Sequence, residues 1–252
     1  MSEIIILSLI QGITEFLPIS SSSHLIIFSN FLNFQDQSLS IDISLHIGSF
    51  IAVIVYFIKD ILNFAKNKVL FLKIILSSIP IILCGYLLVR FNLIEQLRNI
   101  KVIGWTTLCF GILLFISDQF DTKKNIKNDL NLKSVIFIGM MQILSLVPGT
   151  SRSGISITAA RLLNFNRVDS AKISFLLSIP TLGAVSLFGI TNLIIEKNLN
   201  FSFLNLIAIF LSFAFSFITI KYFLKFIKKF SLKIFVLYRI VLGIIILTLA
   251  YL

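Results

Sequence analysis

Charged side chains are scarce in this sequence. Asp, Glu, Lys and Arg make up 13% of its 252 residues, whereas hydrophobic residues make up 57%. A soluble domain of this size usually has about a quarter of its residues charged. Long runs such as residues 41–58 hold a single acid, Asp42, at their edge, and runs of roughly 17–25 apolar residues match the hydrocarbon core of a bilayer. The composition therefore excludes a soluble globular domain and predicts an integral membrane protein.

Cysteines and acidic residues are also few, and each shortage makes certain kinds of site or partner less favoured. Cys84 and Cys109 both lie inside apolar runs, which favours small core residues over a disulfide or a metal pair. Acids number 11 against 22 basic residues, a net charge of +11. In a membrane protein such an excess collects in cytoplasmic loops, so we expect no nucleic-acid partner. No charged segment with a small-residue cleavage site opens the chain, so we expect the first span to direct insertion.

Six apolar runs are long enough to cross a bilayer, and two further apolar regions are interrupted. The long runs are residues 41–58, 69–89, 100–117, 170–195, 201–223 and 232–252. The interrupted regions are 4–32, broken by Pro18 and the serines 20–23, and 135–163, broken at residues 148–153. Each half of an interrupted region is too short to cross at 1.5 Å per residue. We therefore predict an all-α fold of six transmembrane helices and two re-entrant helical hairpins, whose polar turns are buried in protein or line a cavity.

The two interrupted regions resemble each other, which indicates an internal repeat. Leu17-Pro18-Ile19-Ser20-Ser21-Ser22-Ser23 aligns with Val147-Pro148-Gly149-Thr150-Ser151-Arg152-Ser153, and Leu32-Asn33-Phe34 aligns with Leu163-Asn164-Phe165. One membrane domain, 1–252, would then contain a first repeat, 1–117, and a second, 133–252. Most lysines fall on one side of the predicted spans, which makes that side cytoplasmic. The first hairpin then enters from outside and the second from the cytoplasm, so the repeats are inverted and their turns meet inside the membrane.

Four ionisable residues lie in the interrupted regions: Glu15, His24, Arg152 and Arg161. A charge at membrane depth is costly unless it is paired or wetted, so its first interpretation is functional. Arg152 offers a planar fork for phosphate oxygens, Glu15 can hold a divalent cation, and His24 can move a proton near neutral pH. Serine hydroxyls and helix N-termini at both turns add donors for anions. The pattern predicts a phosphate site, with Glu15 or His24 within roughly 8 Å of Arg152.

Each of these residues also has a purely structural interpretation. Serines beside a proline commonly cap helices, and His24 could be a packing residue. Glu15 and Arg152 could form a salt bridge that only clamps the repeats. Arg161 could pair with a loop acid, and Arg239, at the cytoplasmic end of the last run, is expected to snorkel or pair. The convergence of these groups at two matching turns favours the functional interpretation.

Two motifs are long and distinctive. The first is Gln11-Gly12-Ile13-Thr14-Glu15-Phe16-Leu17-Pro18-Ile19-Ser20-Ser21-Ser22-Ser23-His24-Leu25, and the second is Pro148-Gly149-Thr150-Ser151-Arg152-Ser153-Gly154. In these motifs, and in the hydrophobic layout of essentially the whole chain, the sequence resembles the undecaprenyl-diphosphate phosphatase family of bacteria, also known for bacitracin resistance. The resemblance implies a hydrolase of the bacterial inner membrane with six spans and two inverted hairpins. It would remove the terminal phosphate of undecaprenyl diphosphate and so regenerate the lipid carrier for cell-wall precursors.

The resemblance also implies roles for individual residues. The catalytic residues would be Glu15, Ser21, His24 and Arg152. Substrate binding would fall to Ser22, Gly149, Thr150, Ser151 and Ser153. A divalent cation, Mg²⁺ or Ca²⁺, would be held by Gln11 and Glu15, whose four-residue spacing puts them on one helix face. The sequence departs from the family pattern at Gln11, where many members have glutamate, and at Ser23, where glycine or another small residue is usual before the histidine.

The competing interpretation is a secondary transporter or lipid flippase for an anionic, phosphorylated substrate. Such proteins also combine inverted repeats with broken helices, and a fold does not fix a function. In either case the partners are a lipid and the bilayer, and a homodimer is left open. The outward entry of the first hairpin favours a site that faces the outer leaflet. The sequence does not decide which metal is used, or whether Ser21, another serine or water attacks phosphorus.

Overall fold

The computed structural model describes residues 1–32, 38–64, 68–91, 93–195 and 202–252. Every element in this part of the chain is a helix, apart from an isolated bridge between Lys124 and Phe165. The helices are α1 (Ser2–Thr14), α2 (Ser21–Leu32), α3 (Leu39–Tyr56), α4 (Ile58–Phe64), α5 (Lys68–Arg90), α6 (Ile94–Leu97), α7 (Ile100–Asp118), α8 (Ile126–Asp129), α9 (Leu132–Gln142), the 3₁₀ turn η1 (Ile143–Leu146), α10 (Arg152–Leu162), α11 (Arg167–Ile195), α12 (Phe203–Ile227) and α13 (Lys233–Tyr251). Asn33, Phe34 and Phe201, which belong to the predicted repeat and the fifth run, lie outside the described residues.

Within the described ranges, six helices are long and apolar enough to span a membrane. They are α3, α5, α7, α11, α12 and α13, and their apolar stretches have mean hydropathies between 1.8 and 2.4. Each coincides with one of the six predicted runs to within a few residues, so those predictions are confirmed. The chain is therefore a multi-pass membrane protein.

The polarity of these helices is reversed relative to a soluble protein, as α5 illustrates. Leu72, Leu76 and Leu83 are exposed, whereas Ser77 and Ser78 are buried. Ser77 donates a hydrogen bond to the Val135 carbonyl of α9 at 2.9 Å. Small polar residues between helices and large apolar residues outside are typical of membrane bundles, where lipid already satisfies the apolar side chains. The exposed surface of α5 therefore suits contact with acyl chains.

The crossing of α3 and α12 depends on residues with small side chains. A Cβ added to Gly48 would collide with the backbone of Ile209, so only glycine permits this close approach. Next to it, the hydroxyl of Ser49 lies 3.1 Å from that of Ser212 and 2.9 Å from that of Ser216. Interhelical hydrogen bonds of this kind contribute about 0.6–2 kcal/mol each in membranes. The two long helices are thereby fixed at one register.

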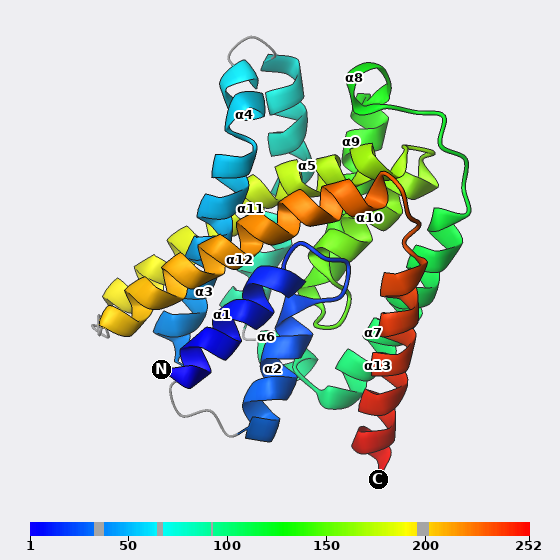
Figure 1. Ribbon diagram of the computed structural model, residues 1–252. Helices are drawn as coiled ribbons and strands as arrows, with labels where there is room; N and C mark the ends of the chain where they lie inside the picture. Colours follow the sequence, from blue (N-terminus) through cyan, green and yellow to red (C-terminus); the bar gives the residue numbers. More distant parts are fainter. Residues whose placement is uncertain (33–37, 65–67, 92, 196–201) are drawn as a thin grey trace.

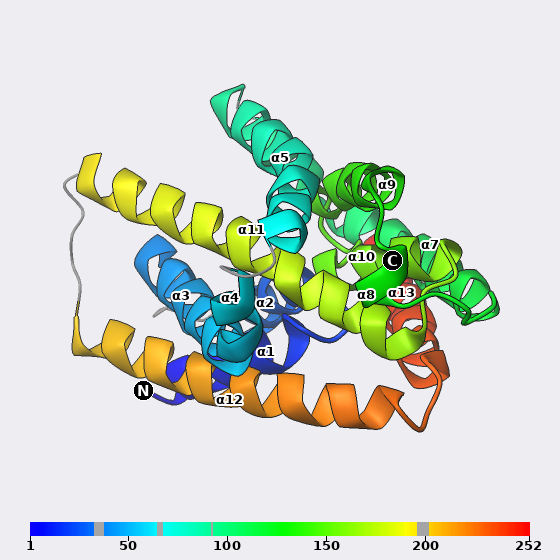
Figure 2. The ribbon, with the colours of Figure 1, turned by 90° about the horizontal axis from the view of Figure 1, so that it is seen from above.

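Four of the shorter helices form two pairs, α1 with α2 and α9 with α10. Their lengths of 11 to 13 residues are too short to cross a bilayer, which is consistent with the predicted re-entrant hairpins. In Figure 1 the turn between α1 and α2 lies near the middle of the molecule. Seen from above, α3 lies between α11 and α12, while α7 and α13 lie together at one end (Figure 2).

The packing partners of the two halves correspond. α1 packs on α12, and α9 packs on α5; likewise α3 packs on α12 and α11 on α5. α3 also contacts α11, and α7 contacts α13, so each of these helices meets its own counterpart. This is the pattern that two inverted repeats would produce. The repeat boundaries, 1–117 and 133–252, stay a prediction.

The end of α7 is joined to α10, α11 and α13 by a group of residues that we call the Asp118 junction. The Asp118 carboxylate, at the end of α7, accepts hydrogen bonds from Arg167 at 2.7 and 3.1 Å and from the Leu232 amide at 3.1 Å. The fully buried Arg161 lies 3.5 Å from the same carboxylate and donates to the carbonyls of Asp118, Phe120, Asp121 and Phe165. Arg161, which could pair with a loop acid, therefore pairs instead with Asp118, the last residue of helix α7.

Candidate active site

The first turn holds Glu15 at the end of α1. The Glu15 amide still donates to the Gln11 carbonyl at 3.0 Å, so both side chains lie on one face of the helix. The Gln11 amide nitrogen donates to Glu15 Oε2 at 3.1 Å, and it also lies 3.0 Å from Nδ1 of His46 on α3. His46 thus joins the site through Gln11. The sequence spacing predicted the first of these contacts, and only the fold reveals the second.

The same turn brings Ser21 to Glu15. Ser20 has a φ of 75°, in the left-handed region that non-glycine residues rarely adopt. This sharp reversal lets α2 begin at Ser21, whose hydroxyl donates to Glu15 Oε2 at 2.7 Å. Ser23, where the sequence departs from the family pattern, lies within α2 and has no positive φ, so serine fits this position without backbone strain.

The second turn repeats this geometry. Gly149 and Ser151 have φ angles of 94° and 71°, and Ser151 stands 131 positions after Ser20. The Ser151 hydroxyl caps α10 by accepting from the Gly154 amide at 3.1 Å. The Ser153 hydroxyl donates to the Leu17 carbonyl of the first turn at 2.7 Å. Both of these predicted substrate-binding hydroxyls therefore already have partners within the protein.

The two turns meet through an ion pair. Nη2 of Arg152 lies 2.7 Å from Oε1 of Glu15, and these side chains are 13% and 5% exposed. The prediction that Glu15 lies within about 8 Å of Arg152 is confirmed, although 137 residues separate the two in sequence. Gln11, Glu15, Ser21 and Arg152 thus form one connected group, which we call the Glu15 cluster.

Half of the Arg152 guanidinium is not used by the protein. Its Nη1 is buried and has no hydrogen-bond partner, and the same is true of the hydroxyl of Thr150, two residues earlier. Unpaired buried donors are costly, and a cationic one is especially so. An anion bound at the second turn would satisfy them. A salt bridge that only clamped the two repeats would not require a guanidinium with a free half.

Arg239 of α13 is fully buried and binds both turns at once. Its Nη1 donates to the Pro18 carbonyl in the first turn at 3.2 Å. In the second turn the guanidinium donates to the carbonyls of Gly149 at 2.9 Å and Thr150 at 3.0 Å, and its Nε donates to the Thr107 carbonyl at 3.2 Å. Arg239, expected to snorkel or to pair, does not snorkel, because buried backbone carbonyls hold its guanidinium inside the protein.

The hydrogen bonds of His24 do not involve the Glu15 cluster. Its Nδ1 is 2.6 Å from the Ser20 carbonyl, and its Nε2 is 2.6 Å from the hydroxyl of Tyr238 on α13. Ser22, predicted to bind substrate, is exposed, and its hydroxyl lies 3.3 Å from that of Ser20. The described contacts thus bring Glu15, Ser21 and Arg152 together and link His24 to α13 instead.

Comparison with known proteins fits this geometry. Residues 4–245 match the family described as "Bacitracin resistance protein BacA". A protein named undecaprenyl-diphosphatase from Pelagibacter ubique (strain HTCC1062) is 49% identical over 250 residues, 99% of this chain and 97% of its own. Proteins of the same name from Saccharophagus degradans (strain 2-40) and Jannaschia sp. (strain CCS1) are 41% and 38% identical, over 95% and 98% of this chain and 94% and 97% of theirs.

The chain belongs to the BacA family. Both distinctive motifs, and with them the Glu15 cluster, fall within the matched residues.

The cation expected from the resemblance to this family is not matched by a convergent set of ligands. Both oxygens of Glu15 accept from protein groups: Oε1 from Arg152, and Oε2 from Gln11 and Ser21. Gln11 Oε1 is buried without a partner and is the one free oxygen of the predicted pair. Across the described ranges, no three His, Cys, Asp or Glu side chains are grouped to share an ion. The cation stays a prediction.

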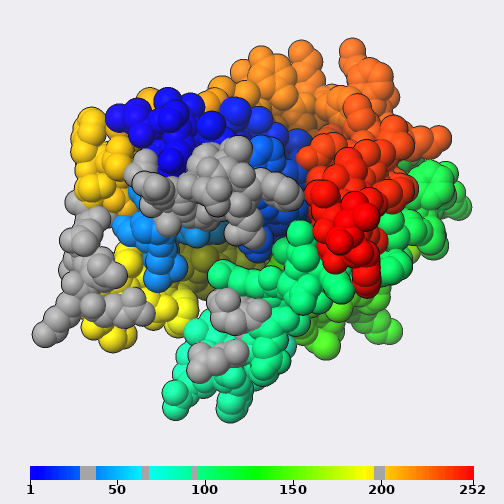
Figure 3. Space-filling model, turned by 90° about the horizontal axis from the view of Figure 1, so that it is seen from below, coloured from blue at the N-terminus to red at the C-terminus, as the bar shows by residue number. Residues whose placement is uncertain are grey.

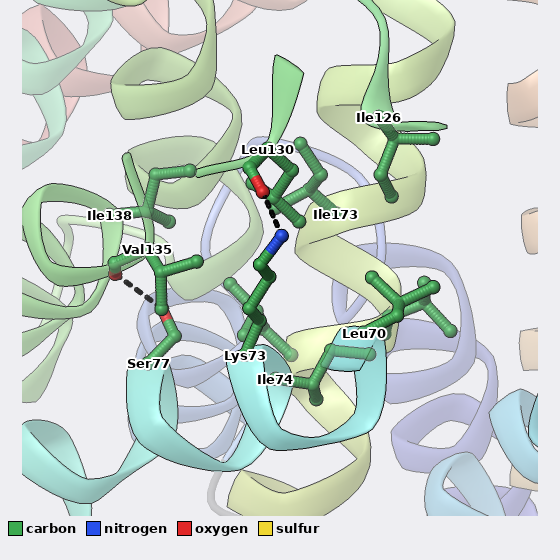
Figure 4. Close-up of a pocket in the computed structure, with 11 residues that line it drawn as sticks. Leu70, Lys73, Ile74, Ser77, Ile126, Leu130, Val135, Ile138 and Ile173 are labelled. Carbon is green, nitrogen blue, oxygen red and sulfur yellow. Dashed lines mark hydrogen bonds between the residues drawn. The ribbon is translucent and has the colours of Figure 1, made fainter. Parts of the chain in front are cut away.

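The hollow shown in Figure 4 is distinct from the Glu15 cluster. It has a volume of about 10 Å³, room for roughly one water, and it lies between α5, α9 and α11. Apart from Ser77 and Lys73, its lining is aliphatic, and Lys73 donates to the Leu130 carbonyl. We assign no chemistry to this hollow.

Proposed function

We propose that this BacA-family protein removes the terminal phosphate of undecaprenyl diphosphate, giving undecaprenyl phosphate and inorganic phosphate. The names of the relatives support this reaction, and so does the multi-pass fold, which suits a lipid substrate. The observation that carries the proposal is the Glu15 cluster. It presents a hydroxyl, a carboxylate and a half-free guanidinium at a buried junction between two turns.

The second turn suits the terminal phosphate. Arg152 Nη1 and the Thr150 hydroxyl are donors without partners. α10 begins at Arg152, so its first backbone amides and the positive end of its dipole lie at the same turn. Two N–H groups on one guanidinium also favour a tetrahedral oxyanion over a spherical ion. The phosphate would replace part of the contact between Arg152 and Glu15, which frees the carboxylate for proton transfer.

The first turn suits the attack on phosphorus. The Ser21 hydroxyl already donates to Glu15 Oε2 at 2.7 Å, which is the arrangement of a nucleophile and its base. As the Ser21 oxygen bonds to the terminal phosphorus, its proton passes to Glu15. The bond from that phosphorus to the bridging oxygen breaks, and undecaprenyl phosphate leaves with its electron pair. Water then hydrolyses the phosphoserine to inorganic phosphate. If water attacks directly instead, Glu15 can accept its proton in the same way.

The sidedness of the site is part of the proposal. We expect the protein in the bacterial inner membrane, with the lysine-rich ends of the spans in the cytoplasm and the site open toward the outer leaflet. A single cysteine at Asn125, between α7 and α8, should react with an impermeant thiol reagent only after spheroplasts are permeabilised. Labelling of this cysteine in intact spheroplasts would show that the proposed orientation is reversed. A cysteine at Gln37 is the complementary probe, although that position lies outside the described residues.

An assay of phosphate release tests the proposed hydrolase function. Purified protein in detergent is given a polyprenyl diphosphate, with and without a chelator, and inorganic phosphate is measured. Release that is lost in Ser21→Ala but kept in Thr191→Val, an exposed control on α11, would support the hydrolase. Transfer of the lipid between vesicle leaflets without phosphate release would favour the flippase instead. If a chelator abolishes release, the predicted cation is required.

A further inference from the structure

The two ring nitrogens of His24 have different partners, and this difference fixes the location of the ring proton. The partner of Nδ1 is the Ser20 carbonyl, 2.6 Å away, which can only accept a hydrogen bond. The Nδ1 atom must therefore carry a proton. In a neutral imidazole Nε2 is then an acceptor, and the Tyr238 hydroxyl, 2.6 Å away, must donate to it. The basic nitrogen of His24, Nε2, thus accepts a hydrogen bond from the phenol of Tyr238.

Tyr238 is also more exposed than His24. The His24 side chain is buried at 5% exposure, whereas Tyr238 is 43% exposed. The two rings are nearly parallel, with centroids 5.7 Å apart and an angle of 11° between their planes. On the face seen from below, blue residues of the first hairpin lie beside red residues of α13 (Figure 3). Tyr238 is therefore the partner of His24 that is more accessible from outside the protein.

The next residue on α13 holds this arrangement in place. Arg239 is bound to carbonyls of both turns, so α13 cannot slide or rotate without breaking those hydrogen bonds. Tyr238 is consequently held in register with His24. The titratable groups that act on His24 are Tyr238 and Arg239 on α13. On the side of α1, the Glu15 carboxylate is bound by Ser21 and Arg152.

We propose that Tyr238 is a positioning residue for His24 that keeps Nε2 as an acceptor and connects it to protons outside the ring. This inference rests on the proposed hydrolase function. A histidine moves a proton efficiently only with the correct nitrogen free and correctly aimed. The Tyr238 hydroxyl can donate to Nε2 while its oxygen accepts from a water, so a proton can pass from that water to His24 through the phenol. No covalent bond other than O–H and N–H changes in this step.

Tyr238→Phe tests the proposal, because it removes the hydroxyl and keeps the ring. We expect kcat for phosphate release to fall about tenfold or more with KM within twofold, since general acid–base groups contribute roughly 100- to 10,000-fold. The phenol favours neutral His24, so the limb of the pH profile where activity rises should move to higher pH. Tyr222→Phe, at an exposed position of α12, should change neither quantity.

Two further measurements isolate the route through His24. In a His24→Gln background, adding Tyr238→Phe should cause no further loss of rate; an equal loss in both backgrounds would overturn the proposal. Nitrogen NMR of histidine-labelled wild-type protein should show His24 protonated at Nδ1 and not at Nε2, with the second histidine identified by His46→Gln. A proton on Nε2 would refute the inference without any variant of Tyr238. Failure of the wild-type protein to release phosphate would instead count against the proposed function.

Discussion

Arg239→Lys is the sharpest test of how the two turns are held together. The guanidinium makes four hydrogen bonds to buried carbonyls, from three different nitrogens and toward three segments of the chain. A lysine ammonium has three N–H groups on one atom, so at least one carbonyl loses its donor. A hydrogen bond to a charged group contributes about 1.5–3 kcal/mol. For a chain of this size, a loss of that magnitude lowers the unfolding midpoint by roughly 3–12 °C.

The activity should fall as well, because the contacts of Arg239 with Pro18 and Gly149 keep Glu15 within reach of Arg152. If only 1.4 kcal/mol of the lost stabilisation affects the transition state, kcat/KM falls about tenfold. Thermal unfolding in detergent and phosphate release would be measured on the same preparation. Arg90→Lys, an exposed arginine at the end of α5, is the matched control and should leave both unchanged. An Arg239→Lys protein with wild-type midpoint and turnover would refute the role of Arg239 in joining the turns.

The remaining predictions concern single positions in the two turns. Arg152→Lys should keep the fold but lower kcat/KM about 10- to 100-fold, because an ammonium cannot hold Glu15 and a phosphate with one planar fork; normal turnover would remove Arg152 from the site. Gln11→Glu places a second carboxylate where an amide now donates to Glu15 at 3.1 Å. Because two carboxylates hold a divalent cation more tightly than one, activity should be maintained or raised at a lower cation concentration. A loss of activity with unchanged metal dependence would contradict this. Gly149→Ala should lower the unfolding midpoint, because its φ is 94° and a Cβ would collide with Thr106, whereas Gly85→Ala meets only a Leu146 methyl at 3.4 Å and should be tolerated.

The spans and the meeting of the turns could be predicted because they follow from local rules. Apolar runs interrupted by proline and serine allow few alternatives in a bilayer. The match between the two interrupted regions then required the turns to approach each other, which the contact of Glu15 with Arg152 confirms. The positive φ angles of Ser20 and Ser151 were not predicted, since no glycine marks either position. The alignment of the two motifs would have suggested equal geometry at both.

The contributions of α13 could not be predicted for a physical reason. In a soluble helix, polar and apolar faces identify the side that packs. Both faces of a transmembrane helix are apolar, so the sequence does not indicate which of Tyr238 and Arg239 faces a turn. The arginine near the end of an apolar run is the usual pattern for snorkelling. Its inward direction depends on carbonyls of Pro18, Gly149 and Thr150 that the chain brings together only on folding.

The Asp118 junction has a consequence for the route by which lipid and phosphate reach and leave the site. A channel or rocking carrier must open each of its two ends in turn. Here, separating α7 from α10, α11 and α13 would break the contacts of Asp118 with Arg161, Arg167 and the Leu232 amide, and a buried charge that loses its partner costs about 3–5 kcal/mol. We therefore expect this junction to stay intact during turnover, so that lipid and phosphate enter and leave the site from the same side of the membrane.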